Sequence, residues 1–330
     1  MYVNNNSIVL LEQIKCDFLN SDGLKRKQSI KLAAACFEEV SGSGPGKPVL
    51  GDDAAVIRFG NKNLLLAADG INLDSMEDLY WAGYCAVLVN VNDIYAMGGQ
   101  PLALVNVIGG SESSLKEIMA GLKDGCKKFG VKMVGGHLHP DSKKNEVSVA
   151  ILGVAERILS SFGACAGDDL ILALDLSGKQ YRNYPHWDST SHKTSNEVLD
   201  RLQAVRLLAQ EGVVNAAKDI SNPGILGTIG MLLETSGVGA VVELSNIQIP
   251  EGFELQKWLS FYPGFGFIFS VNPRNSQVVY NIFRDLGVVA KKIGNVTEVP
   301  QIEICFGNDS RLELINFTQS FITGINKQFR

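Results

Sequence analysis

The residues most suggestive of chemistry are aspartates that stand at the ends of apolar segments or inside them. Asp52 and Asp53 form a pair in the glycine-led turn GDDAAVI, and Asp69 ends the apolar run NLLLAAD. Asp93 interrupts the run VLVNVNDIYAMGG, and Asp219 stands in AAKDISNPGILG. Hard divalent cations such as Mg²⁺ prefer oxygen ligands and are commonly shared between carboxylates and substrate phosphates. The recurrence of these acids predicts a metal cluster that serves phosphate chemistry.

Each acid, taken singly, also has an ordinary interpretation. A pair such as Asp52 and Asp53 at a loop tip is usually a solvated turn, because charged residues are common on surfaces. Asp93 can lie on the polar edge of its helix; if it is instead buried, its charge carries a desolvation cost that a cation or hydrogen bonds must offset. The residues alone leave both interpretations open.

The chain has 330 residues, of which 45% are hydrophobic and 20% charged, with a formal net charge of -5. This composition is that of a globular protein, and the length favours two domains of roughly 100 to 200 residues each. A negative net charge provides no basic field for a polyanion, so we expect no nucleic-acid partner. No apolar run reaches the roughly 18 residues of a membrane span, and the first residues do not look like a leader, so we expect a cytoplasmic protein.

Six cysteines are scattered along the chain without a CxxC pair. We therefore expect neither a zinc site nor a disulfide framework. Cys16, which stands in the segment IKCDF, is expected to be a buried or half-buried thiol that behaves as a small apolar residue.

The periodicity of apolar residues predicts an α/β chain with two halves. In the first half we expect helices at 79–97, with Asp78 as its N-terminal cap, and at 113–129, and strands at 54–59, 63–69, 101–109, 131–134 and 146–154. The pattern restarts at GDDLILALDL, where we expect helices at 196–211, 224–236 and 275–286 and strands at 170–175, 239–244, 265–271, 288–294 and 301–305. A boundary near residue 157 would give domains 1–156 and 157–330.

Six motifs in this order resemble those of the aminoimidazole ribonucleotide (AIR) synthetase superfamily. They are GDDAAV, AADG, YCAVLVNVNDIYAMGGQPLAL, MVGGHLHP, GDDLIL and DISNPGILGTIGMLLETSGVGA. The superfamily includes thiamine-monophosphate kinase, selenophosphate synthetase and a hydrogenase-maturation dehydratase. The resemblance spans residues 45–305.

The resemblance implies a two-domain fold, called PurM-like, whose N-terminal sheet pairs with that of a second copy to form a dimeric barrel. It further implies ATP in a groove at the interface, Mg²⁺ on the triphosphate, a small-molecule substrate and a homodimer. By position, the implied metal ligands are Asp53, Asp69, Asp93 and Asp219. Asp53, Asp93 and Asp219 are also implied catalytic acids, and Asp69 is also an implied nucleotide-binding residue. The remaining implied site residues are Asp52, Asn92, Gly135, Gly136, His137, Ser221 and Asn222 for the nucleotide, with His137 also a catalytic candidate.

Several departures separate this chain from the best-known members. His137 follows the glycine pair where the kinases have an acid, and Asn222 stands where they have a second acid. Ala67 and Ala68 replace a hydroxyl pair, and Cys16 lacks the glycine-rich loop of selenophosphate synthetase. The function implied is ATP- and Mg²⁺-dependent phosphoryl transfer to, or phosphate activation of, an unidentified small molecule. Kinase-like or selenophosphate synthetase-like activity and a catalytically weak scaffold subunit stay open as alternatives.

Two segments rich in aromatic residues, the first of which also contains an arginine, would suit a planar or anionic substrate. The first is the loop around Tyr181, Arg182, Tyr184, His186 and Trp187, and the second is FYPGFGF at 261–267. Packing at a domain interface is the ordinary alternative. The basic run LKRKQ at 24–28 is expected to face solvent.

Overall fold

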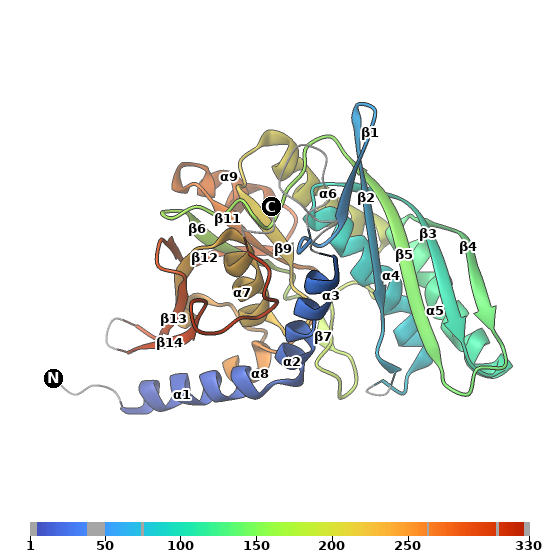
Figure 1. Cartoon of the computed structure of the whole chain (residues 1–330), viewed down its shortest axis with the longest axis horizontal. Coiled ribbons are helices and arrows are strands. Elements are labelled where there is room, and N and C mark those ends of the chain that lie inside the picture. The colour runs from blue at the N-terminus through green and yellow to red at the C-terminus, as the bar shows by residue number, and fades with distance from the viewer. Residues whose placement is uncertain (1–4, 38–49, 74–75, 263, 308–309, 327–330) are drawn as a thin grey trace.

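The computed structural model describes residues 5–37, 50–73, 76–262, 264–307 and 310–326. These residues form two α/β units that lie side by side, with the N-terminal helices placed across the second unit (Figure 1). Each unit is built on one open, mixed sheet covered by helices, which confirms the predicted fold class. The division at 156/157 stays a proposal.

The first unit contains a five-stranded sheet in the order β1-β2-β5-β3-β4. Its strands are β1 (Ala55–Phe59), β2 (Lys62–Gly70), β3 (Gln100–Gly109), β4 (Lys132–His139) and β5 (Glu146–Ala155). Helices α4 (Leu79–Ala96) and α5 (Glu112–Phe129) pack together on one face. Their backbones nearly touch, because a Cβ atom on Gly121 would lie only 1.9 Å from the Tyr80 carbonyl oxygen. This packing fixes the position of α4, which carries Asp93.

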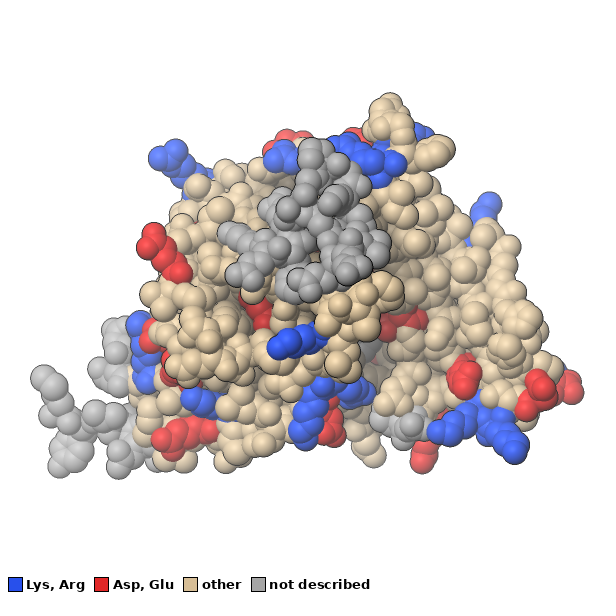
Figure 2. All heavy atoms as spheres, in the orientation of Figure 1, with Lys and Arg blue, Asp and Glu red and all other residues tan. Residues whose placement is uncertain are grey.

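The other face of this sheet is apolar and uncovered. Leu66, Val105 and Val107 are 44%, 43% and 45% exposed. Because directly paired residues share a face, the register places Val107 beside both Ser148 of β5 and His137 of β4. Figure 2 shows this side of the molecule as a mostly uncharged expanse with charged side chains gathered at its lower rim.

The second unit contains a seven-stranded sheet in the order β14-β13-β10-β12-β6-β11-β9. Its strands are β6 (Asp169–Leu174), β9 (Ala216–Asp219), β10 (Gly239–Glu243), β11 (Gly266–Val271), β12 (Val289–Thr297), β13 (Gln301–Cys305) and β14 (Arg311–Asn316). A small ribbon of β7 (Lys179–Gln180) and β8 (Trp187–Asp188) stands apart from it.

Two apolar cores cover the two faces of this sheet. Helices α6 (Ser195–Glu211) and α9 (Ser276–Arg284) share a core with α4, which joins the two units. Helices α7 (Ile225–Ser236) and α8 (Leu255–Trp258) contribute to the core on the opposite face. The interface between the units is therefore continuous with the interior, and residues near it are held in place from both sides.

An N-terminal arm of three helices runs along the second unit. The arm consists of α1 (Asn5–Asn20), α2 (Asp22–Gln28) and α3 (Ile30–Phe37). Leu11, Ile14 and Phe18 of α1 are buried in the second unit's core. The expectation for Cys16 is wrong: its side chain is exposed, because it lies on the outer side of α1.

Most predicted elements are confirmed, with small differences at their ends. Asp78 caps α4 as expected, since its carboxylate accepts a hydrogen bond from the Trp81 amide at 2.9 Å. Strand β4 is longer than predicted, and α1, β9 and β14 were not predicted. No helix among the described residues is long and apolar enough to cross a lipid bilayer.

Candidate functional site

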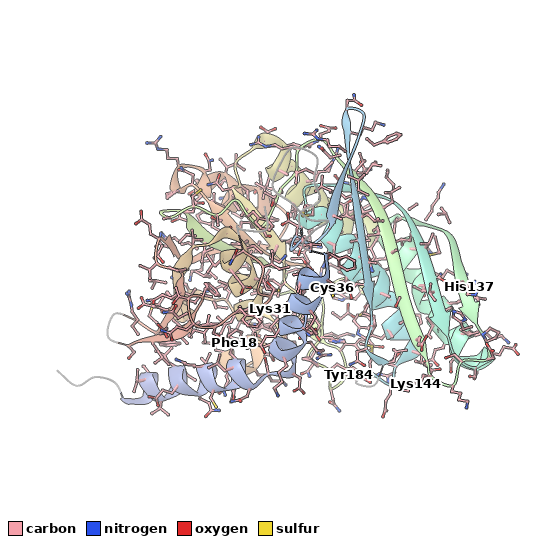
Figure 3. All side chains as sticks on the ribbon, in the orientation of Figure 1. Phe18, Lys31, Cys36, His137, Lys144 and Tyr184 are labelled. Carbon is pink, nitrogen blue, oxygen red and sulfur yellow. The ribbon has the colours of Figure 1, made fainter. Side chains whose placement is uncertain are left out.

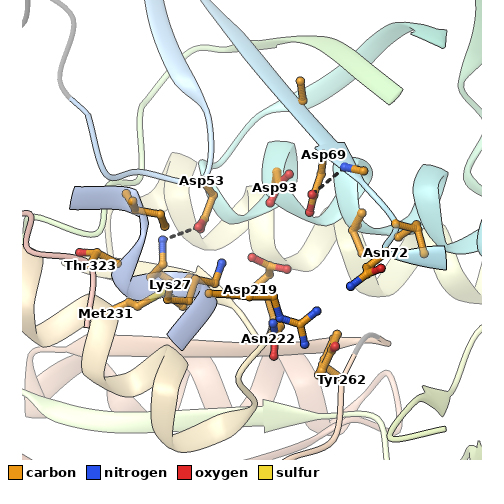
Figure 4. A pocket seen from close by; sticks show the side chains of 18 of the residues that line it. Lys27, Asp53, Asp69, Asn72, Asp93, Asp219, Asn222, Met231, Tyr262 and Thr323 are labelled. Atoms are coloured by element: carbon orange, nitrogen blue, oxygen red, sulfur yellow. Dashed lines mark hydrogen bonds and ion pairs between the residues drawn. The ribbon is translucent and has the colours of Figure 1, made fainter. Parts of the chain in front are cut away.

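A pocket of about 560 Å³ opens where the two units and the N-terminal arm meet. That volume lies within the range of roughly 300 to 1,000 Å³ that small-molecule sites occupy. Its walls come from α2 and α3, from the turn before β1, from the end of β2, from α4 and from the segment after β9. Figure 4 shows the pocket with Asp53, Asp69, Asp93 and Asp219 around it.

Three of the predicted aspartates converge in this pocket. Carboxylate oxygens of Asp53, Asp93 and Asp219 lie within 4.8 Å of one another. The turn before β1 supplies Asp53, the middle of α4 supplies Asp93 and the last residue of β9 supplies Asp219. Residues separated by more than 160 positions thus meet because the two units close on each other. The ordinary interpretation of Asp93 as a solvent-facing residue is wrong.

The three acids repel one another in a buried setting. Burial raises the pKa of Asp219 to about 8, and the nearby Asp53 charge adds to that rise. Burial and the charges of Asp219 and Asp53 also hold the pKa of Asp93 well above its usual range. Among the described residues, no hydrogen-bond donor contacts the Asp93 or Asp219 carboxylate. An arrangement of this kind gains most from a bound cation, which would neutralise the charges at their source.

One cation of the chain already reaches into the cluster. The ammonium group of Lys218, a buried residue of β9, forms a short ion pair with Asp53 Oδ1. The Oδ2 atom of Asp53 is buried and has no hydrogen-bond partner among the described residues. Burial alone would lower the pKa of Lys218. The neighbouring Asp53 and Asp52 charges raise it by more, so the pKa lies above its ordinary value and the side chain stays charged. One carboxylate oxygen of Asp53 is thus paired with Lys218, and the other is free for a ligand.

Asp52 has a different role from its neighbour. Its Oδ1 accepts hydrogen bonds of 2.6 Å from the Ser161 amide and hydroxyl, and its Oδ2 accepts one of 2.8 Å from Ser160. These bonds tie the turn before β1 to the segment that links the two units. Asp52 therefore positions Asp53, although it also lines the pocket.

Asp69 lies at the end of β2, as predicted, and lines the same pocket as the three acids. Its Oδ1 accepts a hydrogen bond of 2.7 Å from the Gly70 amide, while burial by the surrounding walls raises its pKa. Asp69 is outside the tight cluster of Asp53, Asp93 and Asp219. It is close enough to raise the pKa of Asp93 through its charge.

Four predicted residues lie outside the pocket. Asn92 is buried and donates a hydrogen bond of 2.9 Å to the Gly264 carbonyl, so it supports a loop. Gly135, Gly136 and His137 lie on β4, the edge strand of the first sheet. Figure 3 shows His137 on this strand. Within one chain, the structure does not bring them to the acids.

The segment after β9 reaches the pocket as the sequence motif implied. Ser221 and Asn222 line it, and the Ser221 amide donates to the Thr228 hydroxyl at 3.3 Å. The solvent-facing expectation for residues 24–28 is wrong in part, because Arg26 and Lys27 of α2 also line the pocket. The sequence predicts a solvent-facing position for this basic run because its helix is short and no local sequence pattern shows where the N-terminal arm packs.

Sequence reasoning missed Lys218, although one signal for it was present. A lysine inside the apolar run AAKDI, directly before a predicted metal ligand, carries the same desolvation cost that singled out Asp93. The structure confirms that it is buried.

Two family matches cover most of the chain. Residues 51–156 match the family described as AIR synthase related protein, N-terminal domain, and residues 173–305 match its C-terminal domain. The chain belongs to the AIR synthase-related superfamily. This AIR synthase-related protein is 39% identical to a protein of Methanocaldococcus jannaschii described as uncharacterised, over 95% of the chain and 99% of the relative.

Relatives with named activities are more distant. A selenide, water dikinase of Carboxydothermus hydrogenoformans is 30% identical over 64% of each protein. A thiamine-monophosphate kinase of Pyrococcus horikoshii is 27% identical over 61% of this AIR synthase-related protein and 68% of the kinase.

Solved structures share the fold of this AIR synthase-related protein. The structure titled "T. maritima PurL complexed with ATP" matches with a TM-score of 0.73 at 17% identity, over 98% of this chain and 55% of that one. The structure titled "AaThiL complexed with AMPPCP and TMP" matches with a TM-score of 0.64 at 21% identity, over 86% and 95%. These likenesses confirm the two-domain PurM-like fold.

Proposed function

We propose that this protein is an ATP- and Mg²⁺-dependent enzyme that transfers a phosphoryl group to a small molecule or activates phosphate for it. The observation that carries the proposal is the convergence of Asp53, Asp93 and Asp219 within 4.8 Å in an interdomain pocket. The names of the dikinase and kinase relatives, and the nucleotides in the titles of the structural matches, support it.

The donor set fits divalent magnesium. Carboxylate oxygens are the ligands that Mg²⁺ prefers, and the Asp53 Oδ2 atom is buried without a partner among the described residues. Asp53, Asp93 and Asp219 would hold the ion, with Asp69 beside them. When bound, Mg²⁺ would neutralise phosphate charge and orient the phosphates.

The chain's own cations would complete the electrostatic environment. Lys218 lies inside the acid cluster, and Arg26 and Lys27 approach the pocket from the arm. Phosphoryl transfer depends mainly on positioning and on compensation of spread negative charge. The three basic side chains around the pocket supply part of that compensation, so not every phosphate oxygen has to contact a metal ion. They also offset the negative charge that would otherwise repel a nucleotide from four aspartates.

The proposed assembly is a homodimer formed through the uncovered face of the first sheet. A monomer would leave Leu66, Val105 and Val107 in water, and exposed apolar surfaces of this size commonly mark interfaces. Gly135, Gly136 and His137 lie on the edge strand of that same sheet. We propose that they act at the pocket of the partner, since they do not reach the pocket of their own chain.

Calorimetry with a non-hydrolysable ATP analogue and Mg²⁺ tests the proposed site. We expect wild-type protein to bind the analogue only when Mg²⁺ is present. Asp93→Asn and Asp219→Asn should each weaken binding by roughly tenfold or more, because each removes a charge-assisted metal contact. Asp200→Asn, on the exposed side of α6, is the matched control and should bind normally. Equal binding by Asp93→Asn would refute the site assignment.

A nucleotide-binding subunit without turnover is the competing function, and Asn222 in place of an acid favours it. Product analysis distinguishes the two. Release of ADP indicates kinase chemistry, and release of AMP with phosphate indicates dikinase chemistry. Tight Mg²⁺-nucleotide binding without either product in the presence of candidate substrates would favour the subunit.

A further inference from the structure

The pocket continues along α4 beyond the acid cluster. Asp93, Val89 and Cys85 line it at intervals of four residues, which places them on one face of the helix. With a rise of about 1.5 Å per residue, Cys85 lies about 12 Å from Asp93 along the axis. Trp81 is one turn further. The acids therefore occupy only one part of a longer chamber.

His186 lies at the far end of this chamber, and its ring is held in one tautomer. Its Nδ1 atom accepts a hydrogen bond of 3.0 Å from the Trp81 indole N–H, which can only donate. Burial lowers the pKa of His186 to about 4, so the ring is neutral and its proton is on Nε2. The side chain is 6% exposed and lines the pocket, and no described residue accepts a hydrogen bond from Nε2. This N–H is open to the pocket, where an acceptor atom of a ligand can bind it.

Two more side chains face the same space. The ring of Tyr262 lies 5.5 Å from that of His186, and both residues line the pocket. Arg26 also lines the pocket, and its charge opposes the rise in the pKa of Tyr262 that burial causes. No carboxylate of the described residues pairs with Arg26. In Figure 4, Asp219 and Asp93 lie between Tyr262 on one side and Met231 on the other.

Backbone contacts hold this group of residues in place. The Tyr262 amide donates to the Pro185 carbonyl at 3.0 Å, and the Tyr181 amide donates to the His186 carbonyl at 2.8 Å. Tyr181 itself stacks on Trp81 with ring centroids 3.9 Å apart, and its hydroxyl donates to Asp78. Of the aromatic residues singled out in the sequence, Tyr181 thus packs against Trp81, whereas His186 and Tyr262 line the pocket.

We propose that His186, Tyr262 and Arg26 form the subsite for an oxyanion of the acceptor substrate, a carboxylate or a phosphate group. This proposal rests on the proposed function, because the acids are taken to hold the metal-bound nucleotide. The His186 Nε2–H and the Arg26 guanidinium donate to the oxyanion. The carbon skeleton of the substrate lies along Val89, which lies on α4 one turn from Asp93 on the side toward Trp81, and Met76 adds a further apolar side chain to the pocket wall.

The chemistry of the subsite favours an anion over the adenine base. The polar edge of adenine needs an acceptor for its amino group as well as a donor for its ring nitrogen. Neutral His186 and charged Arg26 present donors only, and an oxyanion accepts from several donors at once. The substrate class is therefore a small, elongated molecule with an anionic group about two helical turns from the group that reacts.

Calorimetry with defined anions tests the subsite. The probes are malate and 3-phosphoglycerate, with glycerol as the neutral control, each titrated with and without Mg²⁺ and the ATP analogue. We expect at least one anion to bind wild-type protein and glycerol not to bind. His186→Phe and Arg26→Gln should weaken anion binding by roughly tenfold or more, because each removes a donor to a charged group. His186→Gln, which keeps an N–H donor, should bind more tightly than His186→Phe.

The remaining variants separate the subsite from the nucleotide site. Tyr184→Phe removes a neighbouring hydroxyl that accepts a hydrogen bond from the Glu77 amide and is no part of the proposed subsite, so it should bind anions normally. His186→Phe, His186→Gln and Tyr184→Phe should keep wild-type affinity for the Mg²⁺-nucleotide, and the circular dichroism of every variant should show that it is folded. Loss of nucleotide affinity in His186→Phe would assign the subsite to the base and overturn the proposal. Anions that bind no better than glycerol would also overturn it, whereas anion binding without nucleotide binding would refute only the proposed function.

Discussion

Lys218 gives the three acids a counterion before any metal arrives. Its ammonium group contacts Asp53 and leaves Asp93 and Asp219 without a donor among the described residues. Burial raises the pKa values of the three carboxylates, and the single charge of Lys218 is too little to offset that rise. Lys218 thus holds Asp53 in the pocket but leaves most of the negative charge of the cluster uncompensated.

We predict that Lys218→Met lowers the stability of the metal-free protein by roughly 3 kcal/mol, since breaking a buried pair leaves a charge uncompensated. Mg²⁺ should restore more stability to this variant than it adds to the wild type, because the ion would replace the lost charge. Urea denaturation with and without Mg²⁺ measures both effects. Lys123→Met, on the exposed side of α5, is the control. Equal stabilisation of both proteins by Mg²⁺ would contradict the prediction.

His186 makes a prediction about pH. Its pKa falls from 6.5 to about 4 on folding because the buried ring resists protonation. Between these values the unfolded chain binds a proton that the folded chain does not, so stability falls as the pH drops from 6.5 toward 4. The expected loss between pH 7 and pH 5 is about 2 kcal/mol.

Denaturation curves of wild type and His186→Gln at the two pH values isolate this contribution. The wild type should lose about 2 kcal/mol more than the variant on acidification. His192→Gln changes an exposed histidine of the same loop and should behave as wild type does. The same loss in all three proteins would show that other groups cause it.

At the scale of elements, the N-terminal arm is the part that sequence patterns describe least well. Helix α2 has only seven residues and brings Arg26 and Lys27 to the pocket through its docking on the second unit. The contact is tight at Gly23, where an added Cβ would lie 2.3 Å from Asn222 Oδ1 and 2.5 Å from Pro223 Cβ. A glycine is therefore needed for α2 to approach the segment that follows Asp219.

We predict that Gly23→Ala moves α2 away from this segment and weakens Mg²⁺-nucleotide binding, because Arg26 and Lys27 move with the helix. Helix propensity alone would stabilise the variant by about 1 kcal/mol, whereas the overpacking should destabilise it by roughly 1 to 3 kcal/mol. A less stable variant would show that the overpacking outweighs the helix propensity, and a more stable one would show the reverse. Calorimetry and thermal unfolding measure binding and stability, with Lys25→Ala on the exposed side of α2 as control. A more stable variant with normal affinity would show that the arm does not dock tightly.

The sequence was sufficient for elements whose signals are local. Helix α4 was predicted with its Asp78 cap because an apolar run and a capping residue are local features, and Asp69 was placed at a strand end for the same reason. Asn92 and His137 were assigned to the nucleotide by motif position, and the structure places both outside the pocket of their own chain. Arg26 and Lys218 were missed because their environment depends on contacts between distant segments, which no local pattern records.

At the scale of the whole molecule, the uncovered sheet face is the feature that the described chain does not explain by itself. Helices α4 and α5 cover one face of the strands from β2 to β4. In the part of the chain that the structure describes, Leu66, Val105 and Val107 on the other face stay exposed, and we propose that a second copy of the chain covers them. The paired residues Leu66 and Leu152, and Val105 and Ala150, form an apolar surface without charge at its centre. A stable interface of standard size buries about 800 Å² on each partner.

We predict that the protein is a dimer in solution and that Val107→Asp converts it to a monomer, because a carboxylate buried at the centre of the interface would lack a partner. Sedimentation equilibrium measures the mass directly. Val299→Asp replaces an exposed valine of the second unit and should leave the dimer intact. If His137 acts at the partner's pocket, the monomeric variant should also lose Mg²⁺-nucleotide affinity although Asp53, Asp93 and Asp219 are unchanged. A monomeric wild type, or a Val107→Asp variant that remains dimeric, would contradict the proposed interface. A monomer with full affinity would show that each pocket is complete within one chain.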